Sequence, residues 1–176
     1  GMEPILSFAK NHYYRSHVKI IAKVPAADAT MGEIGFIHEC PNCLYRSEEK
    51  GALLPTEEVC PHCGARTLPI GPLWMGKLQG EGIIDAMLEN LPAMEFGTKK
   101  QMEKFLRILK DEPECGFFYD YHAICREIRV SPPKMEEFVA KLNDMRYVPA
   151  RTHFHPTGIK TAASLAVLTE VLQNWE

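Results

Sequence analysis

Four cysteines have the spacing of a metal site. Cys40 and Cys43 form one Cys-x-x-Cys pair, and Cys60 and Cys63 form a second pair farther along the chain. Each pair places two sulfurs on one tight turn, and two such turns complete a tetrahedron around Zn²⁺ with Zn–S distances of roughly 2.3 Å. Because thiolates fill all four positions, no position is left for a substrate or a water molecule. The pattern therefore predicts a closed, structural zinc site without a catalytic role.

Three other interpretations of these cysteines compete with zinc. A redox-active Cys-x-x-Cys is expected once, near a βαβ pattern, so two matched copies disfavour it. An iron site of rubredoxin type uses similar turns and leaves the identity of the metal open. Two structural disulfides need an oxidising compartment, whereas the first residues do not have the pattern of a secretory leader. We therefore favour zinc and expect a cytoplasmic location.

A second group of chemically useful side chains lies between residues 151 and 161. It combines cations, hydroxyls, imidazoles and an aromatic ring on a predicted exposed hairpin, a mixture suited to phosphates and unstacked bases. We expect RNA contacts from Arg151, Thr152, His153, His155 and Lys160, with Arg15 and Lys19 as a second, weaker patch. The alternative is an ordinary set of surface polar groups. The two histidines could also share a metal, but no third ligand is evident.

Composition indicates a soluble globular protein with no membrane contact. No apolar run approaches the roughly 20 residues that span a bilayer. The formal net charge is −3, yet residues 4–27 and 145–169 contain no Asp or Glu, and these basic islands modestly favour an anionic partner. No paired carboxylates, activated nucleophile, open metal site or glycine-rich nucleotide turn emerges from the chain. The residues alone thus indicate a binding module.

The first two segments that position these residues are expected to be extended. Alternating apolar residues predict one long strand over 12–24, with no partner strand before it. It would pair with strands of the cysteine region or belong to a sheet outside the chain. Extended residues on both sides of the cysteine pairs predict a zinc ribbon, in which Pro69 and Pro72 restrict the last strand to an edge position or an irregular conformation.

After the ribbon the apolar period changes to 3.6 and predicts helices. Thr98 with Gln101 is a predicted capping box, and Asp120 and Ser131 are predicted N-caps of two later helices. Helix, turn, helix and then a two-stranded ribbon is the plan of a winged helix. We therefore expect an α+β chain divided into a strand region (1–34), a zinc ribbon (35–78) and a mostly helical, winged-helix-like domain (79–176).

Several short motifs occur in the order of a known family. They are His12-Tyr13-Tyr14-Arg15, the two cysteine pairs, Gly71-Pro72-Leu73-Trp74-Met75-Gly76, Tyr119-Asp120-Tyr121-His122, Ser131-Pro132-Pro133, and Arg151 to Phe154 followed by Gly158 to Thr161. The chain resembles the C-terminal part of the tRNA (guanine-26-N2)-dimethyltransferase family, mainly its archaeal branch. The resemblance implies an enzyme that transfers two methyl groups from S-adenosylmethionine to N2 of a guanine in tRNA.

The same resemblance implies that a Rossmann-like N-terminal methyltransferase domain, with S-adenosylmethionine and the catalytic turn, is missing here. The strand over 12–24 would then be an orphan strand of that sheet. Our leading hypothesis is a tRNA-binding C-terminal portion without a catalytic site of its own, whose partners are tRNA and the missing domain. The alternative is a free-standing zinc-ribbon and winged-helix protein that binds DNA or another protein.

Overall fold

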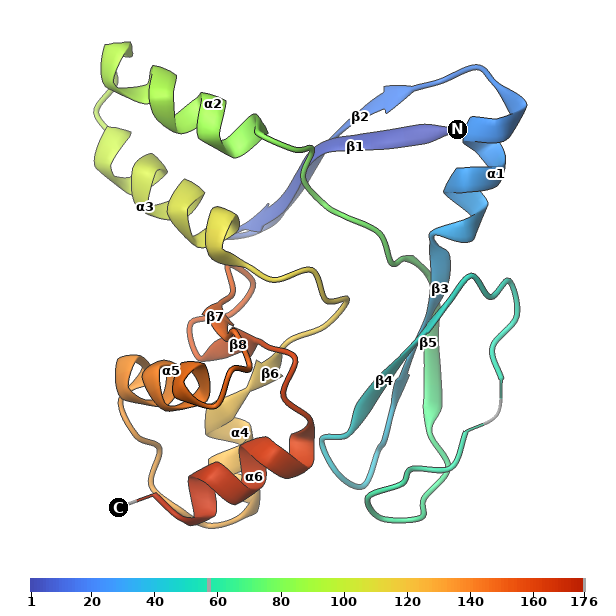
Figure 1. Cartoon of the computed structure of the whole chain (residues 1–176), viewed down its shortest axis with the longest axis vertical. Helices are drawn as coiled ribbons and strands as arrows, with labels where there is room; N and C mark the ends of the chain where they lie inside the picture. Colours follow the sequence, from blue (N-terminus) through green and yellow to red (C-terminus); the bar gives the residue numbers. More distant parts are fainter. Residues whose placement is uncertain (57, 176) are drawn as a thin grey trace.

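The computed structural model describes residues 1–56 and 58–175. In this part of the chain, small antiparallel sheets alternate with short helices, so the predicted α+β class is confirmed (Figure 1). Among the described residues, none of the helices combines the length and apolar character needed to cross a bilayer.

The chain begins with a hairpin of two strands, β1 (Met2–Lys10) and β2 (Tyr13–Ile20). The turn contains Asn11 with a φ of 52°, a left-handed conformation that asparagine tolerates better than most residues. The prediction of one partnerless strand over 12–24 is therefore wrong, because β1 pairs with β2 directly. Within the described residues β2 belongs to this two-stranded sheet, and no Rossmann-like sheet surrounds it.

The predicted strand also ends earlier than expected. From Val24 the chain forms α1 (Val24–Gly32), with Pro25 in its first turn. A helix has no partner for the first backbone N–H groups, so a proline is tolerated at this point and its fixed φ suits the helix.

The cysteine region forms a three-stranded sheet. Its strands are β3 (Ile34–Glu39), β4 (Arg46–Lys50) and β5 (Leu68–Trp74), in the order β4-β3-β5. The central strand β3 buries Phe36, Ile37 and His38. As predicted, the proline-containing strand β5 lies at an edge, where a residue without an N–H group does least harm.

Helices α2 (Ile83–Asn90) and α3 (Lys99–Asp111), with the short 3₁₀ turn η1 (Leu91–Ala93) between them, share a core with the N-terminal hairpin. Leu6 of β1 is buried in this core, and Phe8 packs edge-on against Phe105 of α3 with ring centroids 5.3 Å apart. The predicted capping box at Thr98 is wrong, since its side chain makes no cap hydrogen bond.

The C-terminal unit combines a second three-stranded sheet with three helices. The strands β6 (Tyr119–Asp120), β8 (Gly158–Lys160) and β7 (Ala150–Arg151) are neighbours in that order. The helices are α4 (Tyr121–Glu127), α5 (Met135–Asp144) and α6 (Leu165–Gln173). Their core includes the fully buried Phe138, Leu142, Ile159 and Leu168.

The two N-caps predicted in this unit have different outcomes. Asp120 caps α4 by accepting a hydrogen bond from the backbone N–H of His122 at 3.0 Å, as predicted. Ser131 does not cap α5, whose N-cap is Lys134. The second proline explains the shift, because Pro132, which would be the first helical residue after a cap at Ser131, precedes Pro133 and is disfavoured in the helical conformation.

Candidate metal centre and its surroundings

The four predicted metal ligands come together. One ligand atom from each of Cys40, Cys43, Cys60 and Cys63 lies within 4.8 Å of all the others. The sulfurs of Cys40 and Cys63 are 3.4 Å apart, and those of Cys43 and Cys60 are 3.6 Å apart. A tetrahedron with Zn–S bonds of ~2.3 Å has S–S edges of ~3.8 Å. The thiol groups thus already enclose a space of nearly the size that a tetrahedral metal requires.

The two cysteine turns have the same backbone design. The N–H of Cys40 donates to the carbonyl of Tyr45 at 2.9 Å, and the N–H of Cys60 donates to the carbonyl of Ala65 at 2.8 Å. In the second turn Gly64 has a φ of +75°, which a residue without a Cβ adopts without strain. Each hairpin therefore presents its pair of sulfurs from a hydrogen-bonded loop of the same length.

The thiols influence one another's ionisation. Burial opposes ionisation of Cys40, but hydrogen bonds from the backbone of Asn42 and from neighbouring groups lower its pKa to about 7. Burial raises the pKa of Cys43 to about 12. Burial thus opposes the charged form of Cys43, and a bound divalent cation would offset that penalty.

Three residues predicted to contact RNA are buried instead. The side chains of His153 and Lys160 are 0% and 6% exposed, and Thr152 is also buried. All three face the carboxylate of Glu112, which is 2% exposed. The prediction that these residues lie exposed on a hairpin is thus wrong, because their polar groups bind a buried carboxylate.

The contacts of Glu112 account for this burial. Its Oε1 accepts hydrogen bonds from the hydroxyl of Thr152 at 3.1 Å and from both the backbone N–H and Nδ1 of His153. Its Oε2 lies 3.1 Å from Nζ of Lys160. Burial alone would raise the pKa of Glu112, but His153 and Lys160 outweigh it and lower that pKa below its usual value. No local sequence pattern indicates a role for this residue, which precedes Pro113 just after α3.

The other predicted RNA-contact residues stay at the surface. Arg151 is exposed and pairs with Glu136, and His155 is exposed beside the hydroxyl of Thr157. On β2, Lys19 lies 3.8 Å from Glu3 in an exposed pair, and Arg15 lies over the ring of Tyr13 at 5.5 Å. The structure does not bring these two patches into one cluster of contacts.

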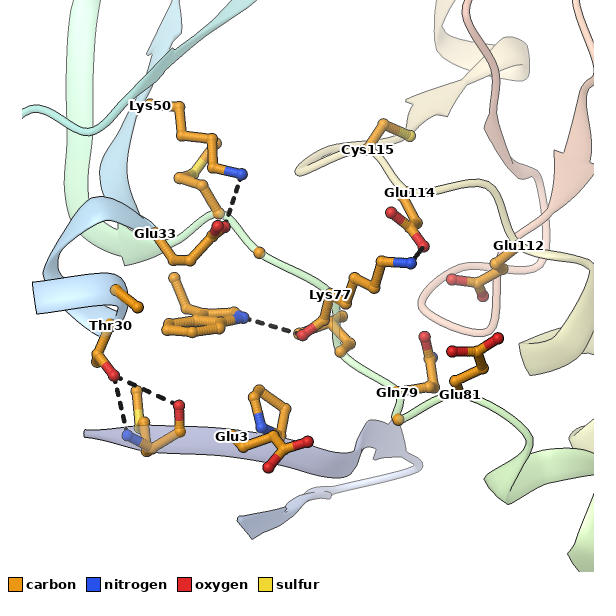
Figure 2. Close-up of a pocket in the computed structure, with 18 of the residues that line it drawn as sticks. Glu3, Thr30, Glu33, Lys50, Lys77, Gln79, Glu81, Glu112, Glu114 and Cys115 are labelled. Atoms are coloured by element: carbon orange, nitrogen blue, oxygen red, sulfur yellow. Dashed lines mark hydrogen bonds and ion pairs between the residues drawn. The ribbon is translucent and has the colours of Figure 1, made fainter. Parts of the chain in front are cut away.

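A cleft of about 760 Å³ opens between β1, the sheet of β3 to β5 and the loop after α3 (Figure 2). Trp74 lines it and donates from Nε1 to the carbonyl of Lys77 at 3.0 Å, while Nζ of Lys77 pairs with Glu114 at 2.8 Å. Acids outnumber cations among the lining residues: Glu3, Glu33, Glu48, Glu81, Glu112 and Glu114 against Lys50, Lys77 and Lys160. The cleft is therefore a poor site for a polyanion.

The chain is similar to known proteins along nearly its whole length. Residues 1–173 match the model of a family described as N2,N2-dimethylguanosine tRNA methyltransferase. The chain is 54% identical over 175 residues to the tRNA (guanine(26)-N(2))-dimethyltransferase of Methanocorpusculum labreanum, with 99% of this chain and 46% of that protein covered. It is 39% identical over 172 residues to the protein of the same name from Methanosphaerula palustris, with 98% and 46% covered.

A solved structure agrees with these sequence matches. The complex of Trm1 from Pyrococcus horikoshii with S-adenosyl-L-methionine is 34% identical and has a TM-score of 0.84, covering 98% of this chain and 44% of that one. The chain thus spans about half the length of the relatives that it matches.

These matches correct the functional expectation. The hypothesis of a tRNA-binding C-terminal portion without a catalytic site is contradicted, because the methyltransferase model matches from residue 1 to residue 173. Assignment to the C-terminal part is not supported. The restriction of S-adenosylmethionine to a missing domain is wrong in part, since the matched Trm1 chain is a complex with that molecule. A free-standing DNA-binding or protein-binding module is not favoured either.

Proposed function

Because the chain belongs to the N2,N2-dimethylguanosine tRNA methyltransferase family, we propose that it acts in the dimethylation of N2 of guanine 26 in tRNA. The observation that carries this proposal is the family match over residues 1–173. S-adenosylmethionine is the proposed methyl donor, because the matched Trm1 structure is a complex with that molecule. The chain covers 46% of the length of the Methanocorpusculum labreanum relative. The activity of the whole enzyme is therefore a proposal for this chain.

The chemistry consists of two successive methyl transfers. The exocyclic amine of guanine attacks the methyl carbon of the sulfonium group, the C–S bond breaks, and S-adenosylhomocysteine leaves. The amine loses one proton in each round, so two rounds replace its two N–H bonds and give N2,N2-dimethylguanosine.

The four cysteines are proposed to hold one Zn²⁺ with a structural role. Support comes from their sulfurs, which lie within 4.8 Å of one another in two matching turns. Zinc would fix the end of the β3–β4 hairpin. From β4, Arg46 donates to the carbonyl of Phe118 at 2.8 Å and pairs with Glu39 at 2.7 Å. A rigid metal turn would therefore stabilise the contact between the ribbon and the C-terminal unit.

The proposed domain division keeps the boundaries 1–34, 35–78 and 79–176. The order β6, α4, α5, β7 and β8 supports a winged-helix-like plan for the last part of the chain. The first and third segments share a core through Leu6 and Phe8. They are thus sequence segments with a joint interior, not independent folding units.

Exposed basic side chains are the proposed contacts to tRNA phosphates. Arg15, Lys19, Arg151 and His155 remain accessible on β2 and on the hairpin of β7 and β8. The buried Thr152, His153 and Lys160 are proposed to hold that hairpin in position through Glu112.

A segment exchange tests the proposed activity. The matching part of the Methanocorpusculum labreanum enzyme would be replaced by this chain, and an unmodified tRNA transcript incubated with the hybrid and S-adenosylmethionine. Nucleoside mass spectrometry is expected to detect N2,N2-dimethylguanosine at position 26. A transcript with adenine at that position is the control, since it lacks the N2 amine. A folded hybrid that binds S-adenosylmethionine but leaves guanine 26 unmodified would contradict the proposal.

A further inference from the structure

A second, smaller pocket lies where the ribbon meets the C-terminal unit. It has a volume of about 230 Å³. Ile37 and Ile70 line it from the ribbon, and Phe118 and Phe154 line it from the C-terminal unit. Its charged lining consists of one acid, Glu39, and two cations, Arg46 and Lys160. Arg46 is paired with Glu39 and Lys160 with Glu112, so this pocket lacks the acidic excess of the larger cleft and opposes an anionic polymer less.

The aromatic rings at this pocket are aligned. The rings of Phe118 and Phe154 have centroids 6.0 Å apart and an interplanar angle of 4°, and those of Phe118 and His155 are 6.2 Å apart at 13°. Phe154 is nevertheless 39% exposed. The ring of His153 also packs against Phe154, with centroids 3.9 Å apart, so the exposed part of the Phe154 ring is the flat π-surface left for a base.

Cations lie beside this aromatic surface. Nζ of Lys160 is 5.4 Å from the centroid of the Phe154 ring, and it is fixed there by its ion pair with Glu112. The guanidinium of Arg46 is fixed by the carbonyl of Phe118 and by Glu39. The pocket thus offers an apolar floor, a flat ring and polar groups whose positions are set before any ligand arrives.

We propose that this pocket receives an unstacked nucleobase of an RNA strand, which stacks on Phe154. The inference rests on the proposed function, because tRNA supplies the strand. Single-stranded loops are the part of an RNA whose bases can leave the stack, and aromatic side chains recognise them without a strict sequence requirement. The exposed guanidinium of Arg151 and the exposed imidazole of His155 lie on the same hairpin and suit the adjoining phosphates.

A binding experiment separates stacking from phosphate attraction. The probes are a fluorescein-labelled single-stranded RNA of ten nucleotides and an abasic strand with the same phosphates. Phe154→Leu keeps an apolar side chain but removes the ring, and we expect it to weaken binding of the complete RNA roughly tenfold, at the lower end of the usual contribution of a stacked base. Binding of the abasic strand is expected to change less than twofold. Phe154→Tyr keeps the ring and is expected to retain the affinity.

Phe96 offers a matched control. It is also 39% exposed, but it lies between η1 and α3 and does not line the pocket. Phe96→Leu is expected to bind both probes like the wild type. Cross-linking of RNA that carries 5-iodouracil, mapped by mass spectrometry, is expected to label Phe118 or Phe154. This measurement on the wild type decides the matter if Phe154→Leu fails to fold.

Several results would overturn the proposal. These are equal binding of complete and abasic RNA by the wild type, unchanged affinity in Phe154→Leu, an equal loss in Phe96→Leu, or cross-links confined to other residues. The segment exchange reports independently on the proposed function. Dimethylation of guanine 26 by a hybrid that carries Phe154→Leu, together with unchanged RNA binding, would reject the base pocket and leave the methyltransferase proposal standing.

Discussion

Oε2 of Glu112, which follows α3, lies 3.1 Å from Nζ of Lys160 on β8, and both side chains are almost completely buried. This ion pair links the helices that pack on the N-terminal hairpin to the small sheet of the C-terminal unit. Because both charges are away from water, each depends on the other for compensation.

Removal of the carboxylate should therefore be costly. Glu112→Gln leaves the ammonium of Lys160 buried without a counter-charge, and we expect a loss of about 3 kcal/mol in the free energy of unfolding, measured with urea. Glu114→Gln is the control, because Glu114 forms an exposed pair with Lys77 that is screened by solvent and should contribute far less. In Glu112→Gln/Lys160→Met no buried charge remains unpaired, so part of the stability should return. Equal effects of Glu112→Gln and Glu114→Gln would contradict this account of the pair.

The same carboxylate predicts a pH dependence. Its pKa is lowered in the folded state, so the folded protein binds this proton less tightly than the unfolded chain does. The stabilisation is complete above the unfolded pKa of about 4.3 and is lost as the pH falls through the folded pKa. The difference in unfolding free energy between wild type and Glu112→Gln should thus shrink below about pH 4.3. A difference that stays constant down to about pH 2 would exclude this linkage.

Metal analysis should find one zinc per chain, bound by the four cysteines. Cys60→Ser removes a ligand that is 1% exposed. We expect this variant to lose the metal and its ribbon to unfold more readily than that of the wild type. Cys115→Ser is the matched control, since Cys115 lies outside the ligand group and should leave the metal content unchanged. Atomic emission measures the zinc, and proteolysis with and without a chelator measures the ribbon. Full zinc content in Cys60→Ser would refute the assignment; iron in place of zinc would change only the metal.

The surface cations predict a salt-dependent affinity for tRNA. Arg151→Gln should weaken binding a few-fold and lower the slope of log affinity against log salt by about 1, because one phosphate contact is lost. Lys134→Gln is a suitable control, since Lys134 is exposed and paired with a glutamate as Arg151 is, but lies before α5. Titrations at two salt concentrations give both quantities. An unchanged slope in Arg151→Gln would remove that residue from the proposed contact surface.

The elements that could be predicted from sequence are those specified by local patterns. The cysteine turns follow from short spacings, the edge position of β5 follows from its prolines, and the cap at Asp120 follows from residue type. Strand β1 was missed because Pro4 interrupts its alternation, and the structure accommodates it with a register shift between Pro4 and Leu6.

The buried contacts between Glu112 and the hairpin of β7 and β8 could not be predicted in the same way. Arg151 to Lys160 has the composition of an exposed hairpin, and its burial depends on Glu112, which is distant in the sequence. From sequence alone, a lysine on a short strand such as Lys160 is predicted to lie at the surface, because its buried carboxylate partner is not evident. The ring alignment of Phe118 and Phe154 is likewise a tertiary feature that neither residue indicates alone.

The packing of Phe8 on Phe105 has a kinetic consequence. The β1–β2 hairpin and the α2–α3 pair can each form from contacts between neighbouring parts of the chain. Their common core, by contrast, joins parts of the chain that are separated in sequence by the whole cysteine sheet. Contacts between residues so distant in sequence carry a large loop-closure entropy and slow the folding reaction. The packing of the hairpin on the helices is therefore expected to form late in folding, after the local elements.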